Sequence, residues 1–334
     1  MKIKEDVDPK LENSSDSIVE DTFCSLLWSA EKKDLSLKII FCSKSDVLLE
    51  GVQDIDKYDN DDAQCCTDYV DDIMQNARKK EKKLKSVKQC LIMDSLDHIH
   101  EKRVIVLDWI IEVCVKFCLL SESFFTCTEL FDMCYQSAAL REETNKPERT
   151  QLIGITCLSI ASKVEETYAP VVRDYLYICD GAYTKEEFVK MERKILTTVK
   201  FEVYPPTSLL FLRRFSKAAM SDAETHTMSK YLCEYACLSY HVCQKFLPSQ
   251  IAAGTILISR IVYKLEPLIT ITMEHYFECE KEVALEAAIA IITFVEQCNK
   301  KALKKKYSQP KLLEVATRDT SSVLPRLRME LTSL

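Results

Sequence analysis

The residues best suited to chemistry stand at the end of the stretch QLIGITCLSIASKVEETYAP, residues 151–170. Apolar and small residues fill its first part, as in a helix that neighbouring helices approach closely, and Lys163, Glu165 and Glu166 then follow. Adjacent glutamates on a helix point about 100° apart, so these two cannot share a proton as a catalytic dyad. A lysine at a helix C-terminus can satisfy the last carbonyls or reach outward. The arrangement favours binding over catalysis.

Other signatures of catalysis and of cofactor binding are missing from the sequence. The only glycines are Gly51, Gly154, Gly181 and Gly254, too far apart for a P-loop or a dinucleotide fingerprint. No serine lies in a GxSxG turn. The 16 cysteines contain no CxxC, and the 5 histidines complete no zinc pattern with them. We therefore predict a protein that is not an enzyme and has neither a cofactor nor a metal.

Composition and charge limit the cellular compartments and the classes of partner that are expected for the protein. The first residues resemble no signal peptide, so the cysteines are expected to be reduced thiols in the core. No apolar run reaches the roughly 18 residues that span a bilayer. Of the net charge of −7, residues 1–66 contribute −8 (16 Asp and Glu against 8 Lys and Arg), which leaves the rest near +1. This balance indicates neither a nucleic-acid partner nor a membrane partner.

The chain divides into an acidic start and a helical body. Residues 1–66 are rich in Ser and Asp and are predicted to be largely disordered, with a transient element at 35–49. Helical periodicity begins at Tyr69 and returns at 103–120, 121–138, 151–165, 171–180 and 185–201. Ser121 or Ser123 is the expected cap of the 121–138 helix. The YPP sequence at 204–206 must interrupt the helical pattern.

After this break the pattern restarts with four further helices, within 206–219, 224–242, 248–265 and 281–298. The third contains Ala252, Ala253 and Gly254, and Gln250–Ile258 aligns without a gap with Gln151–Ser159. We predict an all-α fold of two tandem units, each around one closely packed central helix. The units are 67–204, with a preceding helix, and 205–315, and residues 316–334 are a C-terminal tail.

We predict Glu192 as the partner of Lys163, because it directly follows the apolar Met191 on an amphipathic helix. Val164, Leu196 and Phe201 would then form an apolar floor beside this ion pair. Such a charged rim over apolar residues can receive a helix of another protein. The alternative is a surface salt bridge worth at most about 1 kcal/mol.

Several ordered motifs resemble the cyclin family. KRVIVLDWIIEV resembles the signature MRxILxDWLxEV, IASKVEETYAP resembles LASKxEExxxP, and DGAYTKEEFVKMERKIL is similar to the cyclin segment that carries ME. The match runs from about Tyr69 to at least Ile261, with a short insertion near residues 141–147. The resemblance implies two tandem five-helix cyclin boxes, preceded by an N-terminal helix and the acidic tail.

The resemblance also implies roles for single residues. Arg103 and Asp132 would form an internal ion pair, and Leu152 would pack in the core. The residues expected to bind a cyclin-dependent kinase are Lys163, Glu192, Tyr69, Ile73, Val164, Glu165, Glu166, Leu196, Phe201 and Val203. Lys163 and Glu192 would hold the kinase loop that leads into its αC helix. Binding would move that helix inward and help the activation loop to reorganise.

A second surface is implied on the 103–120 helix. Ile105, Val106, Trp109, Glu112 and Gln151 match the patch on which cyclins dock Arg-x-Leu motifs of substrates and inhibitors. Lys102 replaces the leading Met of the family signature, so docking of basic motifs is expected to be weaker or altered. The alternative is that these are ordinary residues at the edge of the core.

The motifs of the two boxes resemble different cyclin types. FLRRFSKAA, KYLCEYACLSY and PSQIAAG resemble mitotic B-type cyclins, whereas DWIIEVC, QLIGI and ICDGA resemble E-type cyclins. No RxxL destruction box or KEN precedes the first box, and no proline follows Ser or Thr. We predict a kinase regulatory subunit of the G2/M phase, in nucleus and cytoplasm. The alternatives are a G1/S cyclin and a helical scaffold that activates no kinase.

Overall fold

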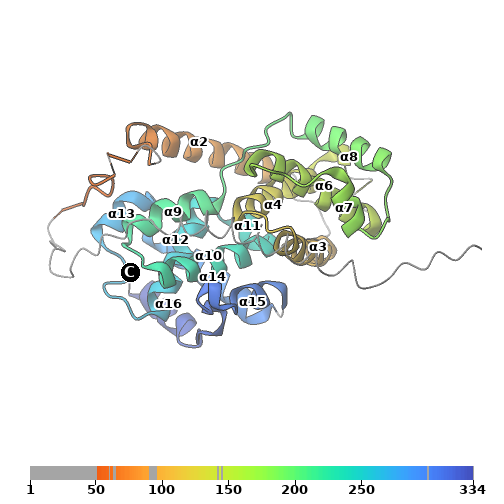
Figure 1. Ribbon diagram of the computed structural model, residues 1–334. Coiled ribbons are helices and arrows are strands. Elements are labelled where there is room, and N and C mark those ends of the chain that lie inside the picture. Colours follow the sequence, from red (N-terminus) through yellow and green to blue (C-terminus); the bar gives the residue numbers. More distant parts are fainter. Residues whose placement is uncertain are drawn as a thin grey trace, which may run out of the picture. The chain divides into compact units, whose positions relative to one another are not determined.

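The computed structural model describes residues 51–59, 61–62, 65–89, 96–140, 143, 146–298 and 301–333 (Figure 1). Within these ranges the regular secondary structure is entirely helical, so the all-α prediction is confirmed. Disorder is predicted for residues 1–66, of which residues 1–50, including the element at 35–49, lie outside the described residues. Within the described part of that region, Gln53, Ile55 and Asp56 are instead held by hydrogen bonds to residues of the second half of the chain.

The central helix of the first unit is α6 (Pro147–Glu165), and Pro147 lies in its first turn. Around it lie α3 (Leu96–Lys116), α4 (Ser121–Gln136), α7 (Val172–Ile178) and α8 (Lys185–Thr198), and each of them contacts α6. The short helix η2 (Ala138–Leu140) follows α4. Leu152, Ile155 and Leu158 of α6 are fully buried. The central helix expected from its small and apolar residues is therefore present, and Leu152 lies in the core as predicted.

The second unit repeats this plan around α12 (Pro248–Val262). Its neighbours include α9 (Ser208–Ala218), α10 (Ala223–Leu238), α13 (Ile271–Phe277) and α14 (Lys281–Gln297). Shorter elements complete it: α11 (Tyr240–Lys245), α15 (Lys301–Tyr307), η3 (Pro310–Leu312), η4 (Val315–Thr317) and α16 (Val323–Thr332). The break at Tyr204–Pro206 separates α8 from α9, as the sequence predicts.

A glycine in each central helix allows a neighbouring helix to approach. A Cβ on Gly154 would lie 2.6 Å from Cγ1 of Val106 on α3. A Cβ on Gly254 would lie 2.8 Å from the backbone nitrogen of Ala288 on α14. Real Cβ atoms do not approach other atoms so closely. The close packing of α3 on α6 and of α14 on α12 therefore depends on glycine, which has no side chain, at these two positions.

Two boundaries differ from those predicted. The helix expected over 224–242 breaks at Ser239, whose hydroxyl accepts a hydrogen bond from Val242 N and so caps α11. Residues 316–334, predicted as a tail, contain α16, which packs on α14 and α12. Val323 and Leu327 of α16 are fully buried, since they stand four residues apart on one face of the helix.

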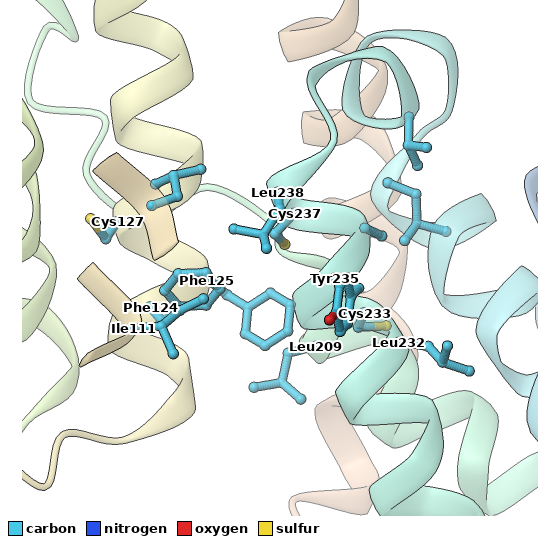
Figure 2. Packing of buried hydrophobic residues seen from close by; sticks show 14 of the residues in the cluster. Ile111, Phe124, Phe125, Cys127, Leu209, Leu232, Cys233, Tyr235, Cys237 and Leu238 are labelled. Atoms are coloured by element: carbon cyan, nitrogen blue, oxygen red, sulfur yellow. The ribbon is translucent and has the colours of Figure 1, made fainter. Parts of the chain in front are cut away.

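Apolar side chains join the two units. Figure 2 shows Phe124 and Phe125 of α4 on one side, and Leu209 of α9 with residues of α10 on the other. Both phenylalanines are 1% exposed, so water is excluded from this junction. Burial of aromatic side chains of this size is the main source of stability at such a contact.

The predicted internal ion pair lies within the first unit, and its arginine also contacts the second unit. Arg103 of α3 donates to both carboxylate oxygens of Asp132 on α4, at 2.6 and 2.9 Å, and both side chains are fully buried. A third bond, 2.8 Å long, runs from Nη1 of Arg103 to the carbonyl oxygen of Leu238 on α10. Arg103 therefore ties the first two helices of one unit to the second unit.

The helix that precedes the first box, α2 (Val70–Gln89), follows η1 (Thr67–Tyr69) and is fastened to the second unit. Arg78 donates to the carbonyl oxygens of Tyr276 and Phe277, each at 2.9 Å. Glu81 accepts from the backbone nitrogen and hydroxyl of Ser249, at 3.0 and 2.8 Å, at the start of α12. Burial raises the pKa of Glu81, although these hydrogen bonds oppose the rise.

Candidate functional site

The ends of α6 and α8 place Lys163 and Glu192 together. Nζ of Lys163 donates to Oε1 of Glu192, and the two side chains are 47% and 17% exposed. The lysine is therefore accessible from solvent, while its carboxylate partner is largely covered. The predicted pairing of these two residues is confirmed.

Local sequence explains why Glu192 faces Lys163. The hydroxyl of Thr184 accepts from Glu187 N, and the Glu187 carboxylate accepts from Thr184 N, which forms a capping box at the start of α8. Phe188, Met191 and Ile195 of α8 are buried against the core. With these three side chains directed inward, Glu192 emerges at the edge of the buried face.

Glu165 and Glu166 are directed inward, to α4. Oε1 of Glu165 accepts from the hydroxyl of Thr126 at 2.6 Å. Oε1 of Glu166 accepts from Leu120 N at 2.7 Å and from the hydroxyl of Ser123 at 2.5 Å. Burial raises the pKa of both carboxyls. The two glutamates thus have internal partners, unlike the outward role expected for them.

This arrangement also corrects the expected cap of α4. Neither Ser121 nor Ser123 caps the helix, because its N-cap residue is Leu120, which has no side-chain oxygen. The carboxylate of Glu166 supplies the acceptor from a distant part of the chain, where an anion also suits the helix dipole. No local spacing in the sequence signals a cap that comes from 46 residues away.

Apolar residues surround the C-terminal end of α8. Val164 is 38% exposed and Phe201 is 70% exposed, while Leu196 and Val203 are half-buried. Backbone hydrogen bonds from Phe201 N to Leu196 O and from Val203 N to Phe201 O keep Leu196, Phe201 and Val203 close together. Phe201 has a φ of +58°, which is unfavourable for an aromatic residue. A strained backbone that presents an apolar ring to solvent is typical of a binding site.

The remaining two expected contact residues lie on α2 and its preceding turn. Tyr69 and Ile73 are 65% and 47% exposed. Lys83 of α2 pairs with Glu202 at 3.3 Å, which brings the later part of this helix beside the Phe201 segment. Ile73 stands ten residues before Lys83, or about 15 Å along the helix. The expected contact residues therefore form an extended surface with two ends.

The second predicted patch is only partly exposed. Ile105 and Glu112 of α3 are exposed, Trp109 is half-buried, and Val106 is buried against Gly154. Gln151 accepts from the hydroxyl of Tyr183 at 3.0 Å. Ile105, Trp109 and Glu112 follow one another at helical intervals and share one face of α3.

Within the described ranges, no group of His, Cys, Asp and Glu side chains is arranged to hold a metal ion. Cys127, Cys157 and Cys233 are buried free thiols, and burial raises the pKa of each of them. None of the helices in the described part of the chain has the length and apolar character needed to cross a membrane.

Comparison with known sequences identifies both units. Residues 72–204 match the family model "Cyclin, N-terminal domain", and residues 206–321 match "Cyclin, C-terminal domain". The second match ends before α16, whereas the packing continues through it. The two matched ranges agree closely with the two units seen in the structure.

Curated relatives and a solved structure agree with this match. The chain is 39% identical to a G2/mitotic-specific cyclin-B of Dictyostelium discoideum, over 80% of this chain and 61% of that protein. It is 33% identical to a G2/mitotic-specific cyclin-B of Marthasterias glacialis, over 81% of this chain and 68% of that protein. A viral cyclin from herpesvirus saimiri shares the fold, with a TM-score of 0.52 and 17% identity over 67% of this chain and 98% of that one. The chain therefore belongs to the cyclin family, and the units around α6 and α12 are its two cyclin boxes.

Proposed function

We propose that this cyclin is the regulatory subunit of a cyclin-dependent kinase and acts in G2 and mitosis. The observation that carries the proposal is the Lys163–Glu192 pair, solvent-accessible at the edge of an exposed apolar surface. The similarity to G2/mitotic-specific B cyclins supports the mitotic assignment over the G1/S alternative. The subunit supplies binding energy and contributes no catalytic group.

Lys163 and Glu192 would bind the kinase in complementary ways. The ammonium of Lys163 donates to backbone carbonyls, and the carboxylate of Glu192 accepts from backbone N–H groups. Val164 and Phe201 would cover the apolar side of the kinase αC helix, with Leu196 and Val203 beneath them. Inward movement of that helix then aligns the kinase's own ATP-binding groups.

The test is kinase activation by the full chain. The chain is mixed with a mitotic cyclin-dependent kinase, beside Lys163→Ala, Glu192→Ala and the double variant. We expect each single change to weaken binding by about 2–5 kcal/mol, since a kinase backbone group is left buried without its partner. Lys190→Ala is the control, because this exposed lysine lies on α8 about 200° from Glu192. Binding without activation would support the scaffold alternative instead.

We further propose that the exposed face of Ile105, Trp109 and Glu112 docks Arg-x-Leu motifs. Glu112 supplies a carboxylate for the arginine, and the apolar side chains receive the leucine. Lys102 repels a basic motif, so we expect Lys102→Met to tighten binding of a fluorescent Arg-x-Leu peptide. Binding that is unchanged by both Lys102→Met and Trp109→Ala would contradict this site.

We propose that the protein is present in both nucleus and cytoplasm. Residues 77–88, ARKKEKKLKSVK, form a basic run of the kind that can act as an import signal or as the solvated face of a helix. The run lies on α2, where Arg78 is bound to the carbonyl oxygens of Tyr276 and Phe277 and Lys83 is paired with Glu202. These contacts favour a structural role for the run over an import signal. We expect a fluorescent fusion with Lys79→Ala and Lys80→Ala, both exposed in the structure, to keep the wild-type distribution.

A further inference from the structure

Residues 53–59, here called the clasp segment, lie on the second box ahead of α2. Gln53 N donates to the hydroxyl of Thr272 at 3.2 Å, and Ile55 N donates to the hydroxyl of Tyr276 at 3.4 Å. Both acceptors are side chains of α13. Two alternate backbone N–H groups at the start of the segment are thus bound by one helix. The chain then turns at residues 55–58, where Asp59 N donates to Asp56 O at 2.9 Å.

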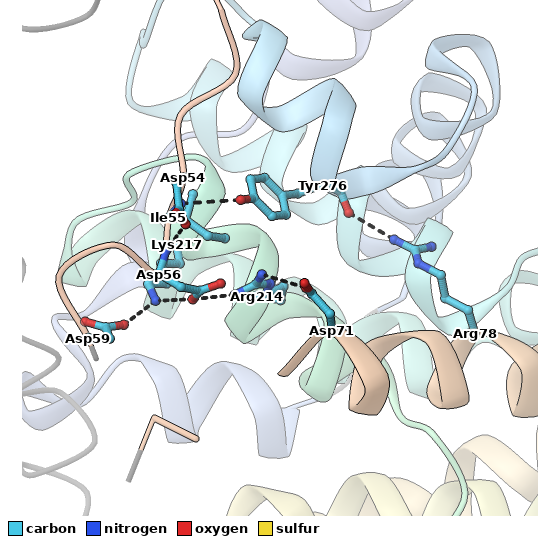
Figure 3. A network of polar contacts seen from close by, with 9 residues as sticks. All are labelled: Asp54, Ile55, Asp56, Asp59, Asp71, Arg78, Arg214, Lys217 and Tyr276. Atoms are coloured by element: carbon cyan, nitrogen blue, oxygen red, sulfur yellow. Dashed lines mark hydrogen bonds and ion pairs between the residues drawn. The ribbon is translucent and has the colours of Figure 1, made fainter. Parts of the chain in front are cut away.

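Charge pairs fix the second half of the clasp segment to α9 (Figure 3). Asp56 accepts from Arg214 and from Lys217, each at 2.6 Å, and Asp59 accepts from Lys217. Arg214 and Lys217 stand three residues apart, so they share one face of α9. Burial acts to raise the pKa of Asp56, but the bonds from Arg214 and Lys217 outweigh it and lower that pKa.

The same basic and aromatic residues also hold α2. Nη2 of Arg214, a side chain only 8% exposed, lies 3.7 Å from Asp71 in the first turn of α2. Tyr276 binds Ile55 with its hydroxyl and Arg78 of α2 with its carbonyl oxygen. Figure 3 shows Arg214 and Tyr276 between the clasp segment and α2. Arg214 and Tyr276 are therefore shared anchors.

We propose that the clasp segment is a positioning element for kinase binding: it fixes the start of α2, so that Tyr69 and Ile73 are presented at a set place on the partner-binding surface. This inference rests on the proposed function. Tyr69 and Ile73 flank Asp71, the residue that Arg214 approaches. The clasp segment holds Arg214 in place by occupying its other nitrogen, so its loss would release the first turn of α2 and lower the affinity contributed by the two apolar residues.

The test compares Asp56→Ala and Lys217→Met with the matched control Asp61→Ala, an exposed aspartate just after the segment. Affinity of each full-length chain for a mitotic cyclin-dependent kinase is measured by calorimetry. We expect both clasp variants to weaken binding about tenfold and the control to bind like wild type. The effect of Asp56→Ala should disappear in a Tyr69→Ala/Ile73→Ala background and persist in a Lys163→Ala background. A loss that persists equally in both backgrounds would indicate general destabilisation and overturn the inference.

Hydrogen exchange separates this inference from the proposed function. In the chain without kinase, Asp56→Ala should speed amide exchange in residues 70–77 while exchange in α6 stays unchanged. Exchange that is unchanged in α2 would overturn the clasp whatever the kinase does. A wild-type chain that fails to bind the kinase would overturn the proposed function, and with it the role of the clasp in kinase binding. Wild-type binding that Asp56→Ala leaves equally tight would overturn the clasp alone.

Discussion

At the scale of single residues, neighbouring charges on α6 have opposite tasks. Lys163 is accessible from solvent beside Glu192, whereas Glu165 and Glu166 serve α4 from within. Lys163 and Glu165 are two positions apart on α6, so their side chains point about 200° apart. Glu166 follows the helix as its C-cap residue in an extended conformation, with φ −92° and ψ 143°, so it does not follow the helical rotation. One end of one helix can therefore stabilise the fold and receive a partner.

Removal of the Glu166 carboxylate should destabilise the chain without changing the kinase-binding pair. Glu166→Ala leaves Leu120 N and the hydroxyl of Ser123 without their acceptor, which we expect to cost about 1–2 kcal/mol in the free energy of unfolding. Urea denaturation measures this loss. Glu165→Ala, which removes a single bond from Thr126, is the comparison and should cost less. An equal or larger loss for Glu165→Ala would contradict the capping role.

His226 makes stability depend on pH. Burial, assisted by the charges of Lys230 and Arg213, lowers the pKa of His226 from 6.5 to about 4. Between these values the unfolded chain binds the proton more strongly, so the histidine's contribution is complete above pH 6.5 and is lost as pH falls toward 4. One proton corresponds to at most about 1.4 kcal/mol per pH unit.

This dependence can be isolated by substitution. We expect His226→Asn, which keeps a polar atom near the hydroxyl of Ser216, to lose less stability than wild type between pH 6.5 and pH 5. Urea denaturation at the two pH values gives the difference. Equal losses in the two proteins would show that the imidazole does not titrate as described.

At the scale of helices, the central helix of each box depends on one glycine. Alanine normally favours a helix over glycine by about 1 kcal/mol. In Gly254→Ala, however, the added methyl would lie 2.8 Å from a backbone nitrogen of α14, which cannot rotate away. We expect a net loss of about 1–3 kcal/mol from overpacking, measured by thermal or urea unfolding. Gly154→Ala meets the side chain of Val106 instead and should cost less.

The same scale shows what could be predicted from the sequence. The small residues of α6 and α12 predicted two closely packed central helices. The position of Glu192 directly after the apolar Met191 predicted its pairing with Lys163. Each of these signals is local, within one helix or its periodicity. The capping of α4 by Glu166, the anchoring of 53–59 by Arg214 and Lys217, and the packing of α16 depend on contacts between distant segments. No periodicity or spacing records such contacts, and an acidic segment such as 53–59 reads as disordered when its basic partners are unknown.

At the scale of the whole molecule, Arg103 is the central charge between the boxes. Arg103→Met would leave Asp132 fully buried without its cation, at an expected cost of about 3–5 kcal/mol in the free energy of unfolding. The double variant Arg103→Met/Asp132→Leu removes both charges and should recover much of this loss. Urea denaturation of the three proteins tests the coupling, and a double variant that loses the sum of the single losses would contradict it.

The hydrogen bond from Arg103 to Leu238 O makes the two boxes depend on each other for stability. Repeat units in a solenoid touch only their neighbours and can be added or deleted. Here the Arg103 guanidinium of the first box has one of its hydrogen-bond acceptors in the second box. In addition, α15 of the second box packs on α3 of the first. Either box produced alone would expose apolar surface and leave a guanidinium without one of its acceptors. We therefore expect the two boxes to unfold in a single calorimetric transition and to be retained together in evolution.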